Sequence, residues 1–180
     1  MEERLRLREF GSQLWGRETA RRVRARLVGI LETMRAGDVL VVDADGVNAF
    51  DFSFAAELFS KTLATLAGEF PGRFVVVENP NECTGENLAE ALGRSNLVMI
   101  VRKQGEVGLL GKVHPTDQQT FAEIIRTRDA VSAVALSRKL EVNLTAMNER
   151  LSKLTSLGLV RRERASSTAG REQYVYRSLT

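Results

Sequence analysis

Carboxylate and hydroxyl side chains gather in one short stretch of the first half of the chain. Asp43 and Asp45 end an apolar run, and Asp51 and Ser53 follow within ten residues. Closely spaced carboxylates can bind a metal ion or act as an acid–base pair. Loops after strands also favour Asp, and Asp or Ser often begins a helix. We expect these turn and cap roles, and hence neither a metal site nor an enzyme.

The elements around this stretch alternate between strands and helices. Three nearly continuous apolar runs predict buried strands, and the alternating charges of residues 4–8 predict an edge strand. Apolar residues at helical spacing between the runs predict helices over 23–34, 55–66 and 88–92. The three buried runs are Val39–Asp43, Phe74–Glu78 and 97–102. This order predicts an α/β layer of about 100 residues.

A glycine-rich stretch separates this layer from the rest of the chain. Residues 104–115 hold three glycines and one proline, which is typical of a linker or a loose hairpin. We place the domain boundary there, so that residues 1–103 form one domain and residues 116–180 form another.

The second domain has a different pattern. Thr116 or Asp117 can cap a first helix, Ser132 a second, and Asn143 a third after a short turn. Apolar residues recur at spacings of four and three in the third helix, which Gly158 ends. Residues 159–164 and 173–177 then predict two strands around a polar tip. The order is helix, helix, turn, helix, strand, strand.

This order, with the segment LSRKLEVNLTAMNERLSKLTSLGLVRRER, resembles the winged helix-turn-helix domains of bacterial MarR- and ArsR-type regulators. The resemblance implies that the third helix reads DNA bases and that arginines on the wing contact phosphates. Glu149 departs from the family, because a carboxylate repels phosphate, although it can accept from cytosine. The implied DNA-binding residues are Asn143, Thr145, Asn148, Glu149, Ser152, Arg162, Arg164 and Arg171.

The first domain resembles the STAS domains of bacterial anti-sigma factor antagonists. The residues that carry this likeness are VLVVDADGVNAFDFSFAAELF, and in particular Ser53-Phe54-Ala55-Ala56-Glu57-Leu58-Phe59. The resemblance implies a mixed sheet with helices. It also implies that this domain contacts a protein partner, for example an ATP-binding kinase. It also implies phosphorylation of Ser53, for which a simple helix N-cap is the alternative.

Composition limits the remaining classes. Apolar residues make up 43% and charged residues 27%, which is typical of a globular protein. No apolar run reaches the roughly 20 residues of a membrane span, and the first residues lack the apolar core of a signal peptide. One cysteine and one histidine do not make a structural zinc site. We expect a cytoplasmic protein without a cofactor or membrane contact.

The two resemblances together predict a bacterial DNA-binding transcriptional regulator. Residues 104–180 hold 12 Lys/Arg against 8 Asp/Glu, a basic balance that agrees with a nucleic-acid partner. We expect a homodimer on double-stranded DNA, with residues 121–127 or the apolar face of residues 23–34 as its interface. The alternative is a non-catalytic interaction component of a signalling or defence complex, whose winged helix docks proteins.

Overall fold

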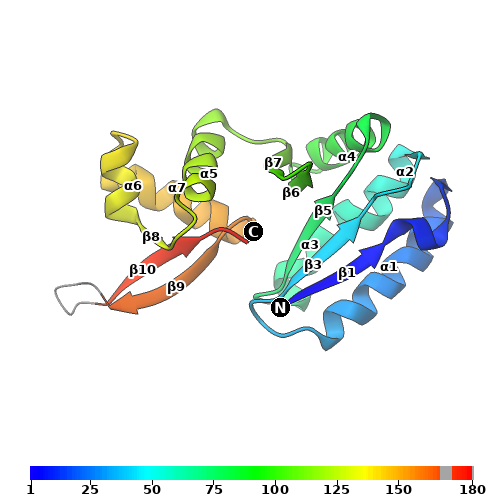
Figure 1. The fold of residues 1–180 in the computed structure, drawn as a ribbon, viewed down its shortest axis with the longest axis horizontal. Helices are drawn as coiled ribbons and strands as arrows, with labels where there is room; N and C mark the ends of the chain where they lie inside the picture. The colour runs from blue at the N-terminus through cyan, green and yellow to red at the C-terminus, as the bar shows by residue number, and fades with distance from the viewer. Residues whose placement is uncertain (167–171, 180) are drawn as a thin grey trace. The chain divides into compact units, whose positions relative to one another are not determined.

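The computed structural model describes residues 1–166 and 172–179 and divides the chain into two compact units (Figure 1). The first unit is Met1–Val113 and the second is His114–Thr180. Each unit has its own sheet, its own helices and its own buried apolar side chains.

A five-stranded mixed sheet forms the frame of the first unit, with the strand order β1-β3-β5-β6-β7. The first four strands run parallel, and β7 pairs antiparallel with β6. These strands are β1 (Glu2–Arg6), β3 (Val39–Asp43), β5 (Phe74–Glu78), β6 (Val98–Lys103) and β7 (Glu106–Gly111). A separate parallel pair consists of β2 (Gln13–Leu14) and β4 (Ala49–Phe50). The predicted α/β unit with a mixed sheet is confirmed. The predicted edge strand is present as β1 but lies two residues earlier than the predicted residues 4–8.

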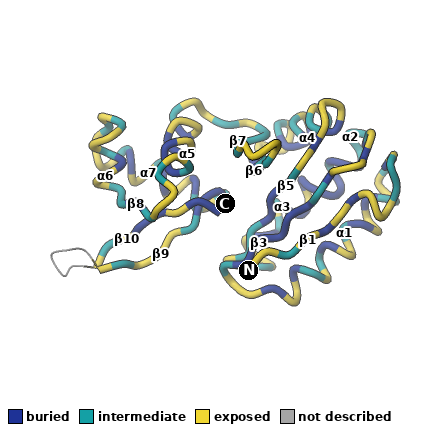
Figure 2. The backbone as a smooth tube through the Cα atoms, in the orientation of Figure 1, coloured by how far each residue is buried: buried dark blue, intermediate teal, exposed yellow. Residues whose placement is uncertain are grey.

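The helices of the first unit pack against one face of this sheet and form the main apolar core with it. Alternate strand residues, such as Leu40 and Val42 of β3, pack with them into one apolar core, while Val41 on the opposite face is also buried. Most of β3 is accordingly coloured as buried in Figure 2. Burial on both faces explains the continuous apolar runs of the sequence. The helices are η1 (Leu7–Phe10), α1 (Gly16–Thr33), α2 (Phe52–Ala55), η2 (Ala56–Ser60), α3 (Lys61–Glu69) and α4 (Glu82–Arg94).

Residues 104–115 were predicted as a linker or a loose hairpin, and the structure shows the hairpin: β6 and β7 pair antiparallel through Gly111, so the linker alternative is wrong for most of this stretch. Gln104 and Gly105 make a two-residue turn with φ values of 52° and 81°, the conformation that joins antiparallel strands tightly. At Gly111 a β-carbon would lie 2.2 Å from the carbonyl oxygen of Leu97, so only glycine allows this approach. The first unit therefore extends through Val113.

The second unit consists of helices packed with a three-stranded antiparallel sheet of order β8-β10-β9. Its elements are α5 (Pro115–Thr127), β8 (Val131–Ser132), α6 (Ala133–Lys139), α7 (Leu144–Ser156), β9 (Arg161–Ser166) and β10 (Glu172–Arg177). The apolar stripe of α7, which includes Met147, Leu151 and Leu154, is buried. The short strand β8 adds an edge that the sequence pattern did not predict.

Polar side chains begin and connect these helices. Ser132 and Asn143 cap α6 and α7 as predicted, accepting from Ala135 N–H and Ala146 N–H. His114, rather than Thr116 or Asp117, caps α5, because its ring nitrogen accepts from Thr116 N–H at 3.3 Å. The histidine that resembled a linker residue is therefore a structural cap.

The two surfaces predicted for dimer contact lie inside the units. Val23, Leu27 and Leu31 of α1 are buried in the core of the first unit. Phe121 and Ile124 of α5 are likewise buried within the second. Their apolar periodicity reflects packing within each unit, so neither face is available to a second copy.

Candidate nucleic-acid interface

One face of α7 presents a row of hydrogen-bonding side chains to solvent. Thr145, Asn148, Glu149 and Ser152 are all exposed, and their spacing of three, one and three residues places them on one side of the helix. No side-chain hydrogen bond within the described part of the chain reaches any of the four. Their donors and acceptors are therefore free to meet a ligand.

Asn143 stands at the start of this helix and differs from the other four. Its side-chain oxygen accepts from Ala146 N–H at 2.8 Å, so that oxygen is already used as the helix cap. Only its amide N–H groups remain for an outside partner. Among the predicted residues of this helix, the structure thus groups four as an open row and assigns Asn143 first to the helix itself.

A compact turn fixes α7 against α6. Ser137 Oγ donates to the Val142 carbonyl at 2.6 Å, and Val142 N–H donates to the Ser137 carbonyl at 3.0 Å. Glu141 occupies the left-handed region at a φ of 53°, which lets the chain reverse within a few residues. The direction of α7 is therefore set by backbone geometry as well as by its buried stripe.

The cations of α7 point toward α5 and leave the open row without a positive charge. Lys153 Nζ lies 2.5 Å from the buried carboxylate of Asp117, and Arg150 Nη1 lies 3.5 Å from Thr120 Oγ1. Both contacts join α7 to α5. Glu149 is consequently the charged member of the open row, and the row itself does not attract phosphate.

Positive charge lies instead on the β9–β10 hairpin. Arg162 and Arg164 are two residues apart on β9, so their side chains share one face of the strand pair. The ring of Tyr174 on β10 lies between them: its centroid is 4.6 Å from the guanidinium carbon of Arg162 and 6.0 Å from that of Arg164. Arg171, the third predicted arginine, lies outside the described residues.

Tyr174 is the member of this site that sequence reasoning missed. It is 44% exposed, which is unusual for a large aromatic side chain, and it stands opposite Arg164 in the strand register. The predicted strand 173–177 already held the signal. Alternation along that strand puts Tyr174 and Val175 on opposite faces, and the apolar Val175 marks the inward one.

In the first unit, Asp51 begins α2, and the prediction that Ser53 does so is wrong. Asp51 Oδ1 accepts from Phe54 N–H at 2.7 Å and from Gly16 N–H at 3.1 Å. One carboxylate therefore holds the starts of both α2 and α1. Ser53 is the second residue of α2 and half-buried, and its hydroxyl is not the cap.

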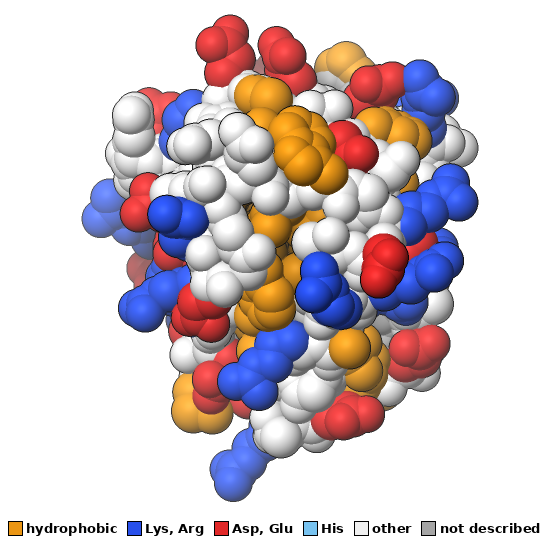
Figure 3. All heavy atoms as spheres, turned by 90° about the vertical axis from the view of Figure 1, so that its right-hand side faces the viewer, with side chains coloured by type: hydrophobic (Ala, Val, Ile, Leu, Met, Phe, Trp, Pro, Cys, Tyr) orange, Lys and Arg blue, Asp and Glu red, His pale blue; other side chains and the backbone are white. Residues whose placement is uncertain are grey.

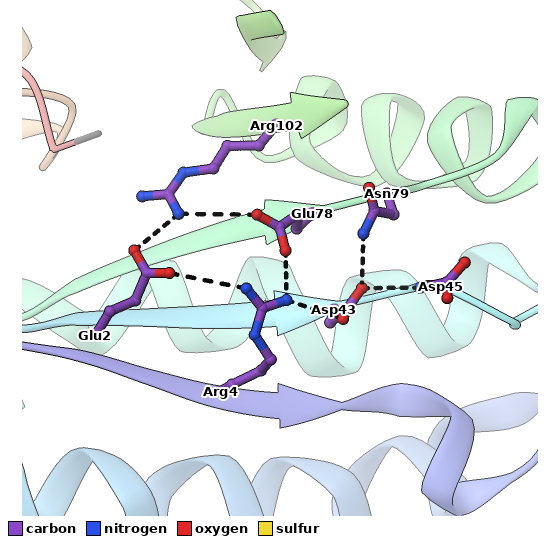
Figure 4. A network of polar contacts seen from close by, with 7 residues as sticks. All are labelled: Glu2, Arg4, Asp43, Asp45, Glu78, Asn79 and Arg102. Atoms are coloured by element: carbon purple, nitrogen blue, oxygen red, sulfur yellow. Dashed lines mark hydrogen bonds and ion pairs between the residues drawn. The ribbon is translucent and has the colours of Figure 1, made fainter. Parts of the chain in front are cut away.

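The carboxylates near the strand ends are paired with arginines (Figure 4). Asp43 accepts from Arg4 at 2.9 Å, from Asn79 at 3.1 Å and from Asp45 N–H at 3.0 Å. Burial raises the pKa of Asp43, but these three hydrogen bonds outweigh it and leave the pKa below its usual value. An ionised, fully bonded carboxylate has the turn role that we predicted.

Arginines link this network to the neighbouring strands. Arg4 also contacts Glu78, and Arg102 Nη1 lies 2.9 Å from Glu2 Oε2 (Figure 4). Throughout residues 1–166 and 172–179 there is no group of three His, Cys, Asp or Glu side chains placed to hold a metal ion. The ion pairs of this network join the four neighbouring strands β1, β3, β5 and β6 of the sheet.

The outer face of the first unit carries both signs of charge. Figure 3 shows Lys and Arg side chains interspersed with Asp and Glu, and apolar side chains between them. Phe10 and Trp15 are exposed near the start of α1, at 37% and 51%. Among the helices of the described residues, none combines the length and the apolar character that a bilayer span requires.

Comparisons with known proteins include a distant structural likeness. No family model matches the chain. No curated protein matches it either. Among solved structures, a possible transcriptional regulator from Methanosarcina mazei Go1 is similar over 37% of this chain and 56% of that chain, with 18% identity and a TM-score of 0.34.

Proposed function

We propose that the second unit is a winged helix-turn-helix domain that binds double-stranded DNA, and that the chain is a transcriptional regulator. The order α5, β8, α6, turn, α7 and β9–β10 hairpin supports this. In such domains the helix after the turn enters the major groove and the hairpin lies along the backbone. The observation that carries the proposal is the open row Thr145, Asn148, Glu149 and Ser152, four polar groups exposed without a partner in the described chain.

The chemistry of the two parts assigns them different roles. Asn148 has the amide that pairs with two atoms of adenine, and Glu149 can accept from the amino group of cytosine. Thr145 and Ser152 can bond to bases or phosphates. Arg162 and Arg164, and with them Arg171, supply the charge that attracts the backbone. Readout by α7 and attraction by the hairpin are thus separable.

The test is selection of a preferred site from a random duplex pool, followed by titration of variants at about 50 mM salt. Asn148→Ala should weaken binding to the preferred site about tenfold and relax preference at one base pair. Gln119→Ala, an exposed polar change on α5, is the matched control and should bind like the parent.

Glu149→Gln separates two roles of the carboxylate. If Glu149 accepts from cytosine, the variant loses preference at that base pair. If it only faces the backbone, the variant binds all sequences more tightly, because a repulsive charge has been removed. A parent chain that shows no affinity for any duplex at about 50 mM salt would contradict the whole proposal.

A second candidate function is protein docking through the same unit. The observation that favours it is a pair of exposed apolar side chains at the starts of α6 and α7, Val134 at 42% and Leu144 at 44%. Apolar side chains at a helix start suit a protein partner better than phosphate. Loss of partner binding in Leu144→Ser, with DNA affinity absent in the parent, would favour this candidate.

For the first unit we propose a STAS-like role in contacting a protein partner. The exposed aromatic residues Phe10 and Trp15 support an interaction role, since such side chains are enriched in interfaces. Ser53 stays a proposed phosphorylation site, and intact-mass measurement after treatment with an ATP-binding kinase tests it. Ser53→Ala is the control that should abolish any added phosphate.

A further inference from the structure

The open edge of β7 carries hydrogen-bonding groups that nothing in the described chain satisfies. The two-residue turn makes Lys103 and Glu106 a hydrogen-bonded pair, and pairs then alternate along the β6–β7 ladder. Val107 and Leu109 accordingly point their backbone N–H and C=O groups away from β6, and the chain bends at Gly111, where φ is 107° and β7 ends. Within the described residues, no hydrogen bond reaches these outward groups.

The opposite edge of the sheet is protected and β7 is not. Strand β1 reads Glu-Glu-Arg-Leu-Arg, so four of its five residues are charged, which is how proteins keep edge strands from pairing. Between Glu106 and Lys112, the β7 edge reads Val-Gly-Leu-Leu-Gly and holds no charge and no proline. Of the two edges, β7 is the one suited to accept another strand.

The sequence of β7 is complementary to itself when two copies run antiparallel about Leu109. In that register Leu109 meets Leu109 of the second copy, Val107 meets Gly111, and Gly108 meets Leu110. Glu106 of each copy then lies opposite Lys112 of the other copy, so the dimer contains two such charge pairs. Glu106 and Lys112 are both exposed. Each larger side chain beside the centre thus faces a glycine, and each end faces the opposite charge.

The backbone agrees with this register. Val107 and Leu109 become hydrogen-bonded positions of the new ladder, so their outward groups are satisfied by the second copy, and the bend at Gly111 ends the ladder on each side. Glu106 and Lys112 fall in a non-hydrogen-bonded pair, where Cα atoms are only about 4.5 Å apart and side chains are closest. Shifting the register by two residues would keep the backbone bonds and lose both charge pairs.

We propose that this chain forms a twofold homodimer in which β7 pairs antiparallel with β7 of a second copy, centred on Leu109. The two five-stranded sheets then make one continuous sheet, with β1 at each outer edge. The proposal uses only residues of the first unit and does not rest on the proposed DNA binding, so either can fail without the other.

Charge reversal tests the register directly, with sedimentation velocity of the full chain as the readout. The parent should sediment at twice the 20.0 kDa of the chain. Glu106→Lys or Lys112→Glu alone places like charges opposite each other twice and should weaken the dimer about tenfold. Both residues are exposed, but Lys112→Glu also removes the hydrogen bond from Lys112 Nζ to Asn96 Oδ1 at 3.3 Å, so circular dichroism of each variant serves as the check on folding. The double variant restores opposite charges and should return to the affinity of the parent.

A cross-link gives a second, independent readout. In a Cys83→Ala background, Leu109→Cys should form an intermolecular disulfide under mild oxidation, because paired Cα atoms about 5.5 Å apart suit the bond. Glu32→Cys, exposed at the end of α1, is the matched control and should stay unlinked. The proposal is overturned if the parent is monomeric at all concentrations, if single reversals leave the dimer unchanged, or if the double reversal is no better than the singles.

Discussion

Asp51 stabilises the first turns of two helices in the first unit. It accepts from two amides that begin two different helices, at 2.7 and 3.1 Å. We expect Asp51→Ala to lower the free energy of unfolding by about 2 kcal/mol, the upper end of the cost of losing a cap, because both amides are left without a partner. Urea denaturation measures this. Asp45→Ala, at an exposed turn, should change it by less than about 0.5 kcal/mol.

Two substitutions of Tyr174 distinguish the contribution of its ring to DNA binding from that of its hydroxyl. The ring orders Arg162 and Arg164 on the proposed wing, and an exposed cation–π contact is worth about 0.5–1 kcal/mol. Tyr174→Ala should therefore weaken DNA binding about threefold, and Tyr174→Phe should keep it. Fluorescence anisotropy on one duplex checks both variants. Equal loss in Ala and Phe would assign the effect to the hydroxyl instead.

At the scale of elements, α5 and α6 are joined by a buried carboxylate whose ionisation controls stability. Lys139 Nζ lies 2.6 Å from Glu123 Oε1 in an ion pair and, with Arg126 and Thr127, holds the pKa of Glu123 below its usual value despite burial. A lowered folded-state pKa means that the stabilisation is present above the ordinary pKa of about 4.3 and is lost as pH falls below it.

The corresponding measurement is thermal unfolding of the second unit between about pH 6 and pH 3. The melting temperature of the parent should fall through the acid end of this range. Glu123→Gln should start lower and show a shallower fall, because the titrating group is gone. Parallel curves for parent and variant would show that other carboxylates cause the acid sensitivity.

Elements differ in how well their sequences predict them. The strands β3, β5 and β6 are nearly continuous in apolar residues, and this pattern predicts both the strands and their burial. Ser132 and Asn143 are residue types that favour helix N-caps, so they predict where α6 and α7 begin. Strand β7 was missed because its glycines are typical of a linker, although Gly111 is required by the close approach of its backbone to the Leu97 carbonyl just before β6. Asp51 and Ser53 were both candidates for a cap of α2, and the structure gives the role to Asp51, whose carboxylate accepts from Phe54 N–H and from Gly16 N–H.

The resemblance to winged helix-turn-helix domains implied the residues of the open row of α7, but it did not predict the electrostatics of that row. Lys153 and Arg150 carry no sequence signal that they face α5, because that direction depends on where Asp117 and Thr120 lie in space. Tyr174 was missed for the same reason. Its importance comes from the register between two strands that are separated in the sequence.

At the scale of the whole molecule, the boundary between the two units predicts which fragments of the chain fold stably. A fragment of residues 1–113 should fold and unfold cooperatively, since it keeps the β6–β7 hairpin. A fragment of residues 1–103 lacks β7, exposes one side of β6 and should aggregate or melt at lower temperature. Circular dichroism on heating compares them. Equal stability of the two would show that β7 is dispensable to the unit.

The close approach at Gly111 also limits how this chain can have diverged from its ancestors. Any side chain there meets the Leu97 carbonyl, so we expect glycine at this position in every descendant that keeps the hairpin. Glu106 and Lys112 are free to change, but only together. A lineage that reversed both charges would still recognise its own copies and would reject those of the parent lineage, so duplicated genes could share one cell without mixing their products.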